Sequence, residues 1–413
     1  MDPPILAAAA ACLARQWHRT CETWGIGDLD RPRPDPCASA SSSPSASAGT
    51  SAHRKRNVHA ELLINGRFLT RQSTGVDRFA LELMRAFAER RPGVKLRALL
   101  PGAAKPYGHA PTGWQLDASG RGDGQTWEQF SLPRLAGDTP LINLCNTAPL
   151  MRQRQLAVIH DAATLANPGN FSFAFRSWYR VMIGALMRRA QVVASVSRFS
   201  ADELIHYFGA RARGVEVIHE GGEHILREPA DTSVIERLSL GGRRYVLAVG
   251  SQSPNKNLVA AVEAMKLLDD PDLLLVAAGG GNNRVFAAAA VSDPRLVTTG
   301  YVSDAQLRAL YEGATCFVFP SYYEGFGLPP LEAMCCGCPV IVSDRASLPE
   351  VCGDAALYCD PADPASLARQ LCKLLDSPAL RDELRATGHA RAASFGWGRA
   401  AQQFSDLIEH NFR

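Results

Sequence analysis

A membrane-spanning helix needs roughly 18–20 consecutive apolar residues, and no run of that length occurs in this 413-residue sequence. A large excess of basic residues is also missing, because 44 Lys and Arg are balanced by 41 Asp and Glu. The overall charge therefore argues against a nucleic-acid-binding protein, and any basic function has to be local. The apolar stretch Ile5–Ala14 has the length of a secretory signal core, but Asp2 precedes it and no Lys or Arg does, so we expect no such signal.

Two common kinds of cofactor site are missing as well. No G-x-G-x-x-G follows a first strand, which makes an NAD-dependent oxidoreductase the less favoured alternative. Cys335, Cys336 and Cys338 are spaced too tightly for a zinc site, so we expect them to pack as small hydrophobic side chains and expect no metal. The cysteine count of eleven is odd in a chain long enough to have its own core, which predicts a reducing, cytoplasmic compartment.

The chain divides into four parts. Residues 1–56 contain a low-complexity segment rich in Ser and Ala that cannot bury a core, so we expect them to be disordered. Short apolar strands then alternate with helical patterns, which predicts parallel sheets covered by helices on both faces. The pattern pauses at Asp231–Arg244 and restarts. We predict two doubly wound, Rossmann-like α/β domains over 57–230 and 240–395, with ligands at the carboxyl ends of their strands, and a helix over 396–413 that packs back on the first domain.

The stretch Ser321–Asp344, SYYEGFGLPPLEAMCCGCPVIVSD, predicts a ligand site. Pro320 ends the preceding strand, and the prolines at 329 and 330 suit the first turn of a helix. The glycine-containing loop between them therefore leads into a helix N-terminus, which attracts an anion. Glu324 and Glu332 flank this anion site, so each can accept hydrogen bonds from hydroxyls on one side of a diphosphate. A catalytic acid–base pair would instead have to converge on one bond.

This stretch resembles the E-x7-E motif of the retaining GT-B glycosyltransferases of family 4. The similarity is strong over Val246–Asp376 and weaker over Val58–Val246. It implies the GT-B fold, in which two Rossmann-like domains face each other across a cleft. It also implies that Glu324 binds hydroxyls of the donor sugar and that Glu332 binds ribose hydroxyls. The backbone N–H groups implied to contact sugar and phosphate are those of Phe326, Gly327 and Leu328.

The segment VGSQSPNKNL resembles the family's diphosphate-binding stretch and implies that Lys256 holds the diphosphate, next to Gly250 and Ser251. Many relatives have arginine where this sequence has Ser251 and Asn255. The departure leaves fewer positive groups for the donor. A catalytically silent nucleotide-sugar binder is therefore an alternative to an enzyme.

Two segments of the first domain resemble the same family. VIHD implies that His160 lies beside the transferring sugar, with Asp161 as its neighbour. TRQSTGVDRFA implies that Gly75 and Val76 lie near the diphosphate or the acceptor. An ordinary strand–helix turn is the alternative for the second segment.

The resemblance implies transfer of a hexose, with retention of configuration, to a glycan or lipid-linked saccharide in polysaccharide or lipopolysaccharide assembly. Likeness to a mannosyltransferase subgroup favours mannose and a GDP-sugar, with a UDP-sugar as the alternative. Lys256 and the helix N-terminus would stabilise the departing diphosphate without a metal.

Two further helices are predicted in the first domain. The helix Phe173–Arg189 combines aromatic and basic residues, which predicts either contact with an anionic membrane or packing on the sheet. For the helix that follows Val196, we expect Ser200 to be the N-cap, with Glu203 three residues later.

Overall fold

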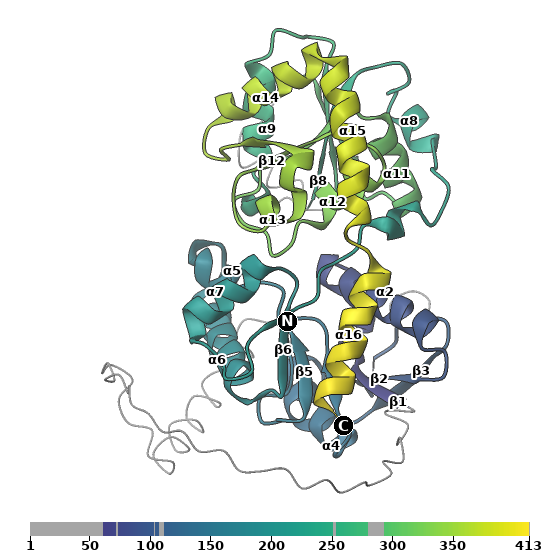
Figure 1. Ribbon diagram of the computed structural model, residues 1–413, viewed down its shortest axis with the longest axis vertical. Coiled ribbons are helices and arrows are strands. Elements are labelled where there is room, and N and C mark those ends of the chain that lie inside the picture. Colours follow the sequence, from purple (N-terminus) through teal and green to yellow (C-terminus); the bar gives the residue numbers. More distant parts are fainter. Residues whose placement is uncertain are drawn as a thin grey trace, which may run out of the picture.

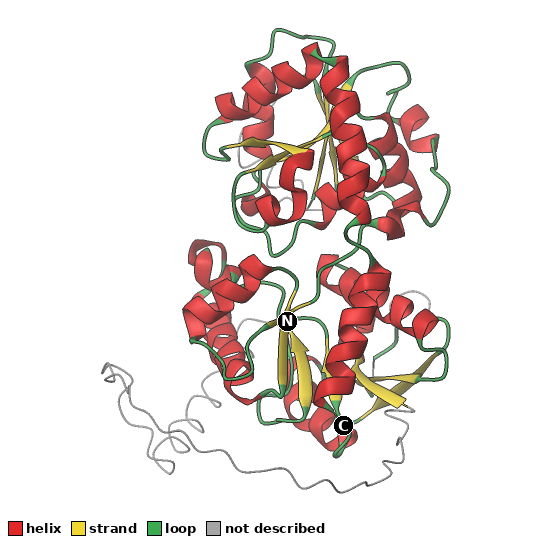
Figure 2. Ribbon diagram, in the orientation of Figure 1, coloured by secondary structure: helices red, strands yellow, loops and turns green. Residues whose placement is uncertain are grey.

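The computed structural model describes residues 61–71, 73–102, 104–106, 111–250, 253–279 and 293–412. The predicted extension 1–56 and Ser251 lie outside these residues. Two parallel sheets form two α/β domains, one above the other in Figures 1 and 2. Within the described residues, no helix has both the length and the apolarity needed to cross a bilayer.

The first domain contains a seven-stranded sheet in the order β3-β2-β1-β4-β5-β6-β7. Its strands are β1 Glu61–Asn65, β2 Lys95–Pro101, β3 Trp114–Ser119, β4 Leu141–Asn143, β5 Gln155–Val158, β6 Val192–Ser195 and β7 Glu216–Val217. Alternate residues point to opposite faces. Ile64 joins the core beneath helix α2, Gly75–Arg90, whereas Leu63 joins a second cluster around Trp127. Both faces of the sheet are therefore covered, as predicted.

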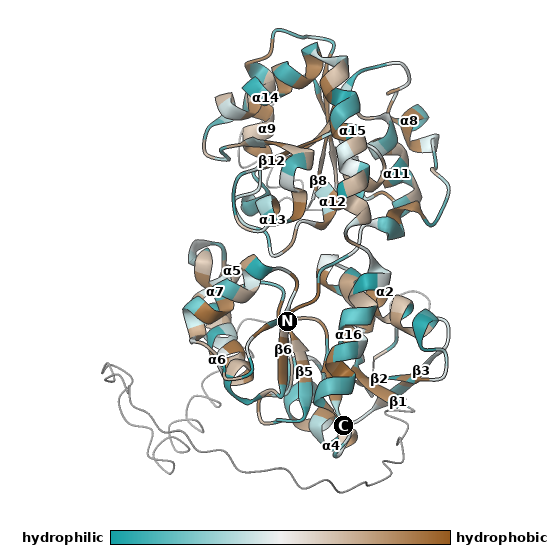
Figure 3. Cartoon of the chain, viewed as in Figure 1, coloured by the Kyte–Doolittle hydropathy of each residue, from teal (hydrophilic) through white to brown (hydrophobic). Residues whose placement is uncertain are grey.

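The second domain contains a six-stranded sheet in the order β10-β9-β8-β11-β12-β13. Its strands are β8 Tyr245–Val249, β9 Leu274–Ala278, β10 Leu296–Gly300, β11 Cys316–Phe319, β12 Val340–Ser343 and β13 Ala356–Cys359. Helices α9 Leu258–Lys266 and α14 Pro364–Asp376 cover one face, and α11 Asp304–Gly313 and α12 Leu328–Cys335 cover the other. The strands are largely hydrophobic in Figure 3. Cys338 is buried in the same core as α12, with Cys335 and Cys336 packed against it.

The remaining helices cover the first sheet, lie in the connections between strands or follow the last strand. They are α3 Gly124–Thr126, a π-helical turn Trp127–Ser131, α4 Leu132–Ala136, α5 Ala163–Ala166, α6 Phe173–Arg189, α7 Arg198–Phe208, α8 Ser233–Arg237, α13 Leu348–Cys352, α15 Pro378–Ala393 and α16 Trp397–Asn411. The yellow α16 in Figure 1 leaves the second domain and returns to the first. It packs on α2, where the rings of Phe87 and Phe404 meet edge to face with centroids 5.2 Å apart.

Helix α6 packs on the first sheet through its C-terminal half, where Met182, Ile183 and Leu186 are buried in one core cluster. At its N-terminal end, Phe173 is 76% exposed. The packing alternative is thus confirmed for the second half of the helix. In helix α7 the expected N-cap is wrong: Ser197 is the N-cap and its Oγ accepts a hydrogen bond from the Ser200 N–H at 3.0 Å. Ser197 has the extended backbone of an N-cap residue, with φ −148° and ψ 162°, whereas Ser200 already lies inside the helix.

Glu350 of α13 links the two domains. Its carboxylate accepts hydrogen bonds from the N–H groups of Arg198 and Phe199 at 2.9 and 3.0 Å, the first turn of α7. His219 lies 2.9 Å from the same carboxylate. Burial raises the pKa of Glu350, but these hydrogen bonds outweigh the burial and leave the pKa below its ordinary value of 4.5.

We predict that Glu350 stabilises the joined domains in a pH-dependent way. A carboxylate with a lowered pKa in the folded state contributes stability above its unfolded pKa and loses it as the pH falls through the folded value. The melting temperature of Glu350→Gln should therefore lie below that of the wild type at neutral pH, and the gap should close below the ordinary value of 4.5. The exposed Glu236→Gln is the control. A gap that stays constant with pH would refute this role.

Candidate active site

The loop between β11 and α12, residues 320–327, is held by hydrogen bonds from side chains to its backbone carbonyls. The pairs are Asn257 Nδ2 to Pro320 O (3.1 Å), Ser343 Oγ to Ser321 O (2.6 Å), Asn255 Nδ2 to Tyr323 O, Ser347 Oγ shared between Glu324 O (2.9 Å) and Phe326 O (2.7 Å), and Ser197 and Ser200 Oγ to Gly325 O (2.5 and 2.9 Å). In a trans peptide the N–H points opposite to the preceding carbonyl. The N–H groups of Phe326 and Gly327 therefore point away from the serines that bind the carbonyls of Gly325 and Phe326.

These N–H groups lie at the start of α12. Gly327 has φ 106° and ψ 51°, a left-handed conformation that suits glycine, and a Cβ there would lie 2.7 Å from Leu348 Cδ2. No hydrogen bond to the N–H groups of Phe326, Gly327 and Leu328 is found within the described part of the chain. Together with the helix dipole, these three donors form a site of positive potential. The helix start predicted from the paired prolines is confirmed.

Lys256 and Glu324 form an ion pair beside this helix start. The Lys256 ammonium lies 2.8 Å from each carboxylate oxygen of Glu324 and 4.8 Å from the ring centroid of Phe319. Solvent reaches little of the pair, since the side chains are 25% and 12% exposed. An ammonium has three N–H donors, so the pair leaves one for a further acceptor.

Glu332 lies one turn into α12 and is buried between two donors. His224 Nε2 is 2.9 Å from Oε1, and the Tyr311 hydroxyl is 3.2 Å from Oε2. The indole N–H of Trp397 lies 3.1 Å from His224 Nδ1, and an indole can only donate, so Nδ1 accepts and Nε2 carries the proton given to Glu332. Burial, together with the Glu332 carboxylate, raises the pKa of Tyr311 well above its usual range, which keeps the phenol protonated.

His224 and Trp397 were not predicted from the sequence. His224 lies in the segment that joins the domains and contacts Glu332 directly. Trp397 begins α16 and contacts Glu332 only through His224. The backbone N–H of Trp397 also donates to Glu223 Oε1 at 2.5 Å. Glu332 is thus positioned by the domain connections as well as by its own helix.

The His160 ring is directed into the first domain. Its Nε2 lies 2.9 Å from the Leu144 carbonyl, which can only accept, so Nε2 carries a proton. Nδ1 lies 3.7 Å from Glu220 Oε1, and the ring meets Phe79 edge-on. The His160 carbonyl faces the second domain instead, because a Cβ at Gly325 would lie 2.4 Å from it. The role of the imidazole beside a sugar therefore stays a prediction.

Asp161 lies within electrostatic reach of the ion pair in the second domain. Burial raises its pKa and Glu324 adds to the rise, while the N–H of Ala163, His160 and Lys256 lower it. The remaining residues predicted for the site lie at the end of a helix or strand. Gly75 is the first residue of α2 and Val76 follows it. A Cβ added at Gly75 would meet nothing within 4 Å.

At the end of β8, Gly250 has φ 150°, and a Cβ there would lie 3.4 Å from Lys256 Cγ. Gly250 therefore lies beside Lys256, at the carboxyl end of its sheet.

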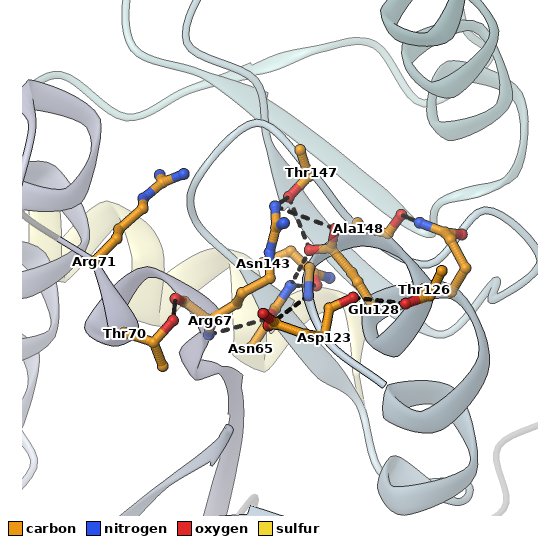
Figure 4. Close-up of polar contacts among 12 residues, drawn as sticks. Asn65, Arg67, Thr70, Arg71, Asp123, Thr126, Glu128, Asn143, Thr147 and Ala148 are labelled. Carbon is orange, nitrogen blue, oxygen red and sulfur yellow. Dashed lines mark hydrogen bonds and ion pairs between the residues drawn. The ribbon is translucent and has the colours of Figure 1, made fainter. Parts of the chain in front are cut away.

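A polar cluster at the carboxyl ends of β1 and β4 was also missed by the sequence analysis (Figure 4). Glu128, which is fully buried in the π-helical turn, accepts hydrogen bonds from Asn65 Nδ2 at 2.6 Å and Thr147 Oγ1 at 2.8 Å. Its Oε2 makes no hydrogen bond within the described residues and lies 3.4 Å from Arg67 Nη2. Arg71 extends beside the cluster and pairs with Asp77. Such π-turns and strand ends are frequent places for ligand sites.

A family model described as "Glycosyl transferases group 1" matches residues 233–391. Over 266 residues, the chain is 31% identical to the O-antigen chain mannosyltransferase B of Escherichia coli, which covers 62% of this chain and 70% of that protein. It is 32% identical over 265 residues to the serotype-specific mannosyltransferase WbdA of Escherichia coli, covering 60% of this chain and 32% of WbdA. The chain therefore spans about a third of that second relative.

Among solved structures, sucrose-phosphate synthase from Thermosynechococcus elongatus superimposes with a TM-score of 0.68 at 20% identity, covering 85% of this chain and 98% of that one. HepE from Anabaena, solved in complex with UDP-glucose, superimposes with a TM-score of 0.66 at 17% identity, covering 85% and 99%. These likenesses show a shared fold.

We predict that His224 positions Glu332 for a nucleotide. His224→Ala removes a hydrogen bond to a buried carboxylate and should weaken binding of a nucleoside diphosphate about tenfold in calorimetry. His224→Gln keeps an N–H donor and should recover part of the affinity. Wild-type affinity in His224→Ala would show that the histidine only packs.

Proposed function

Since the chain belongs to the group 1 glycosyl transferases, the retaining GT-B glycosyltransferases of family 4, we propose that it transfers a hexose from a nucleotide-diphosphate sugar to a glycan or lipid-linked saccharide. Mannose and a GDP-sugar are favoured, with a UDP-sugar as the alternative. The mannosyltransferases among its relatives support the sugar. The observation that carries the proposal is the ion pair Lys256–Glu324 beside the unbonded N–H groups of 326–328, with Glu332 one turn away.

The proposed donor lies along this line of groups. Glu332 accepts hydrogen bonds from the ribose, the start of α12 receives the diphosphate, and Glu324 accepts hydrogen bonds from hydroxyls of the sugar. Gly250 leaves room for the diphosphate beside Lys256. In this proposal His160 and Asp161 of the first domain are the residues nearest the sugar, and Gly75 and Val76 at the start of α2 are near the diphosphate or the acceptor.

During transfer, negative charge grows on the departing diphosphate. The dipole and N–H groups of α12 are already oriented toward that charge, which lowers the barrier without reorganisation. The Lys256 ammonium, held in place by Glu324, donates its remaining N–H to the phosphate oxygens and attracts their negative charge. We propose that these groups replace a metal ion, and that Glu324 binds the sugar rather than forming a covalent bond to it.

The acceptor enters from the first domain in this proposal. The cluster of Glu128, Arg67 and Thr147 offers both donors and acceptors for hydroxyl groups at the carboxyl edge of the sheet. Polysaccharide or lipopolysaccharide assembly at the cytoplasmic face of a membrane is the setting that fits such an acceptor. The family membership argues against the NAD-dependent oxidoreductase.

A catalytically silent nucleotide-sugar binder is the second candidate. Asn255 stands where many relatives have arginine, and its amide is occupied by the Tyr323 carbonyl while its own carbonyl accepts from the Tyr322 N–H at 3.0 Å. Asn255 therefore holds the loop and offers no positive charge to a phosphate. Turnover of a donor separates this candidate from the enzyme.

The proposal predicts sugar transfer in EDTA that depends on Lys256. Wild-type protein incubated with a glycan or lipid-linked saccharide acceptor and GDP-mannose, or UDP-sugars in parallel, should transfer the sugar and release nucleoside diphosphate without added metal. Lys256→Ala should slow release by about 100-fold, the usual cost of losing one charge-stabilising group. Lys266→Ala, an exposed lysine on α9, should match the wild type. Nucleotide binding without any turnover would favour the silent binder, and loss of activity that magnesium restores would refute metal independence.

A further inference from the structure

A pocket of about 550 Å³ lies at the amino-terminal edge of the first sheet, away from the candidate active site. Three segments line it: Gln153 before β5, residues 187–191 at the end of α6, and residues 208–213 after α7. These three segments precede β5, β6 and β7, respectively. The candidate active site lies at the opposite, carboxyl ends of the strands. The pocket is therefore a separate feature of the first domain.

The lining of this pocket is strongly basic. It contains the four arginines 188, 189, 211 and 213 and no aspartate or glutamate. Two more arginines, Arg152 and Arg154, flank the lining residue Gln153. This local charge contrasts with the chain as a whole, whose net charge is only +3.

Arg211 is held in place with part of its guanidinium unused. Its Nη2 donates to the Ala190 carbonyl at 2.6 Å, whereas Nη1 is buried and has no hydrogen-bond partner within the described residues. Burial and the neighbouring Arg213 lower the pKa of Arg211, which reflects a positive charge without a compensating carboxylate. A buried donor without an acceptor is costly, so an oxygen-rich anion in the pocket would relieve that cost.

An exposed apolar side chain, Met151, shares this edge of the domain. Met151 is 71% exposed and lies on the loop that carries Gln153 into the pocket. Arg152 donates to the carbonyls of Gly137 and Thr139, which draws the loop after α4 against the same segment. An exposed apolar side chain beside arginines suits the boundary between lipid headgroups and acyl chains.

We propose that this arginine pocket binds the phosphate group of an anionic membrane lipid and so seats the first domain on a membrane surface. A guanidinium presents two N–H groups in a fork that matches two phosphate oxygens. The clustered arginines supply attraction to a negatively charged surface, and Met151 supplies an apolar contact. The inference does not rest on the proposed transfer reaction, because lipid binding is measured without a donor sugar.

The test is flotation of the full chain with vesicles of phosphatidylcholine, with and without phosphatidylglycerol, at physiological ionic strength. Wild type should float with the anionic vesicles alone and should be released by high salt. The double variant Arg211→Gln, Arg213→Gln should bind about 25-fold more weakly, from about fivefold for each arginine near the surface. The matched control removes two exposed arginines of the linker and second domain, Arg237→Gln and Arg243→Gln, and should bind like the wild type.

Three outcomes would overturn the proposal. The wild type could fail to float with anionic vesicles, or its flotation could survive high salt. The two double variants could also lose vesicle binding equally. Thermal stabilisation by inorganic phosphate tests whether the pocket binds a soluble anion. If phosphate stabilises the wild type but the wild type does not bind vesicles, the pocket binds a soluble anion and the lipid proposal is refuted. An unchanged thermal shift with nucleoside diphosphate shows that each variant is folded, and the salt dependence of wild type decides the matter if a variant is not.

Discussion

The hydrogen bonds from side chains to the carbonyl oxygens of residues 320–326 are the constraint on which the candidate site depends. Backbone carbonyls left toward the cleft would repel a diphosphate. Ser347, from the second domain, holds the carbonyl oxygens of Glu324 and Phe326, the residues on either side of Gly325. Ser197 and Ser200, from the first domain, fix the Gly325 carbonyl itself. The conformation of the loop and the approach of the two domains are therefore set by the same contacts.

The same coupling recurs at Glu332. Its partner His224 belongs to the segment that joins the domains, and Trp397 begins the helix that crosses back. A movement of either crossing segment changes the hydrogen bond to the carboxylate that faces the proposed ribose. Glu350 also connects the two domains, because its carboxylate, from the second domain, caps helix α7 of the first. The contacts between the domains and the hydrogen bonds at the candidate site thus involve the same residues.

Local signals predicted most of the architecture. Alternating strands and helices indicated two parallel sheets, and the pair Pro329–Pro330 located the start of α12. The strands β3, β4 and β13 carry the weakest local signal, because they are short or half-exposed. The glutamates and Lys256 could be read because they lie within motifs. Ser347 and His224 could not, since His224 contacts a residue 108 positions away and nothing in the local sequence specifies that contact.

The claim that the carbonyl-bound loop creates the anion site is tested most directly by Ser347→Ala. Ser347 touches no group of the proposed donor and acts only by holding the carbonyls of Glu324 and Phe326. Calorimetric titration with nucleoside diphosphate should give an affinity about tenfold weaker than that of the wild type, the cost of a hydrogen bond that fixes a charge-binding group. The exposed Ser233→Ala serves as control. Equal affinity in Ser347→Ala and wild type, with both folded, would contradict the account.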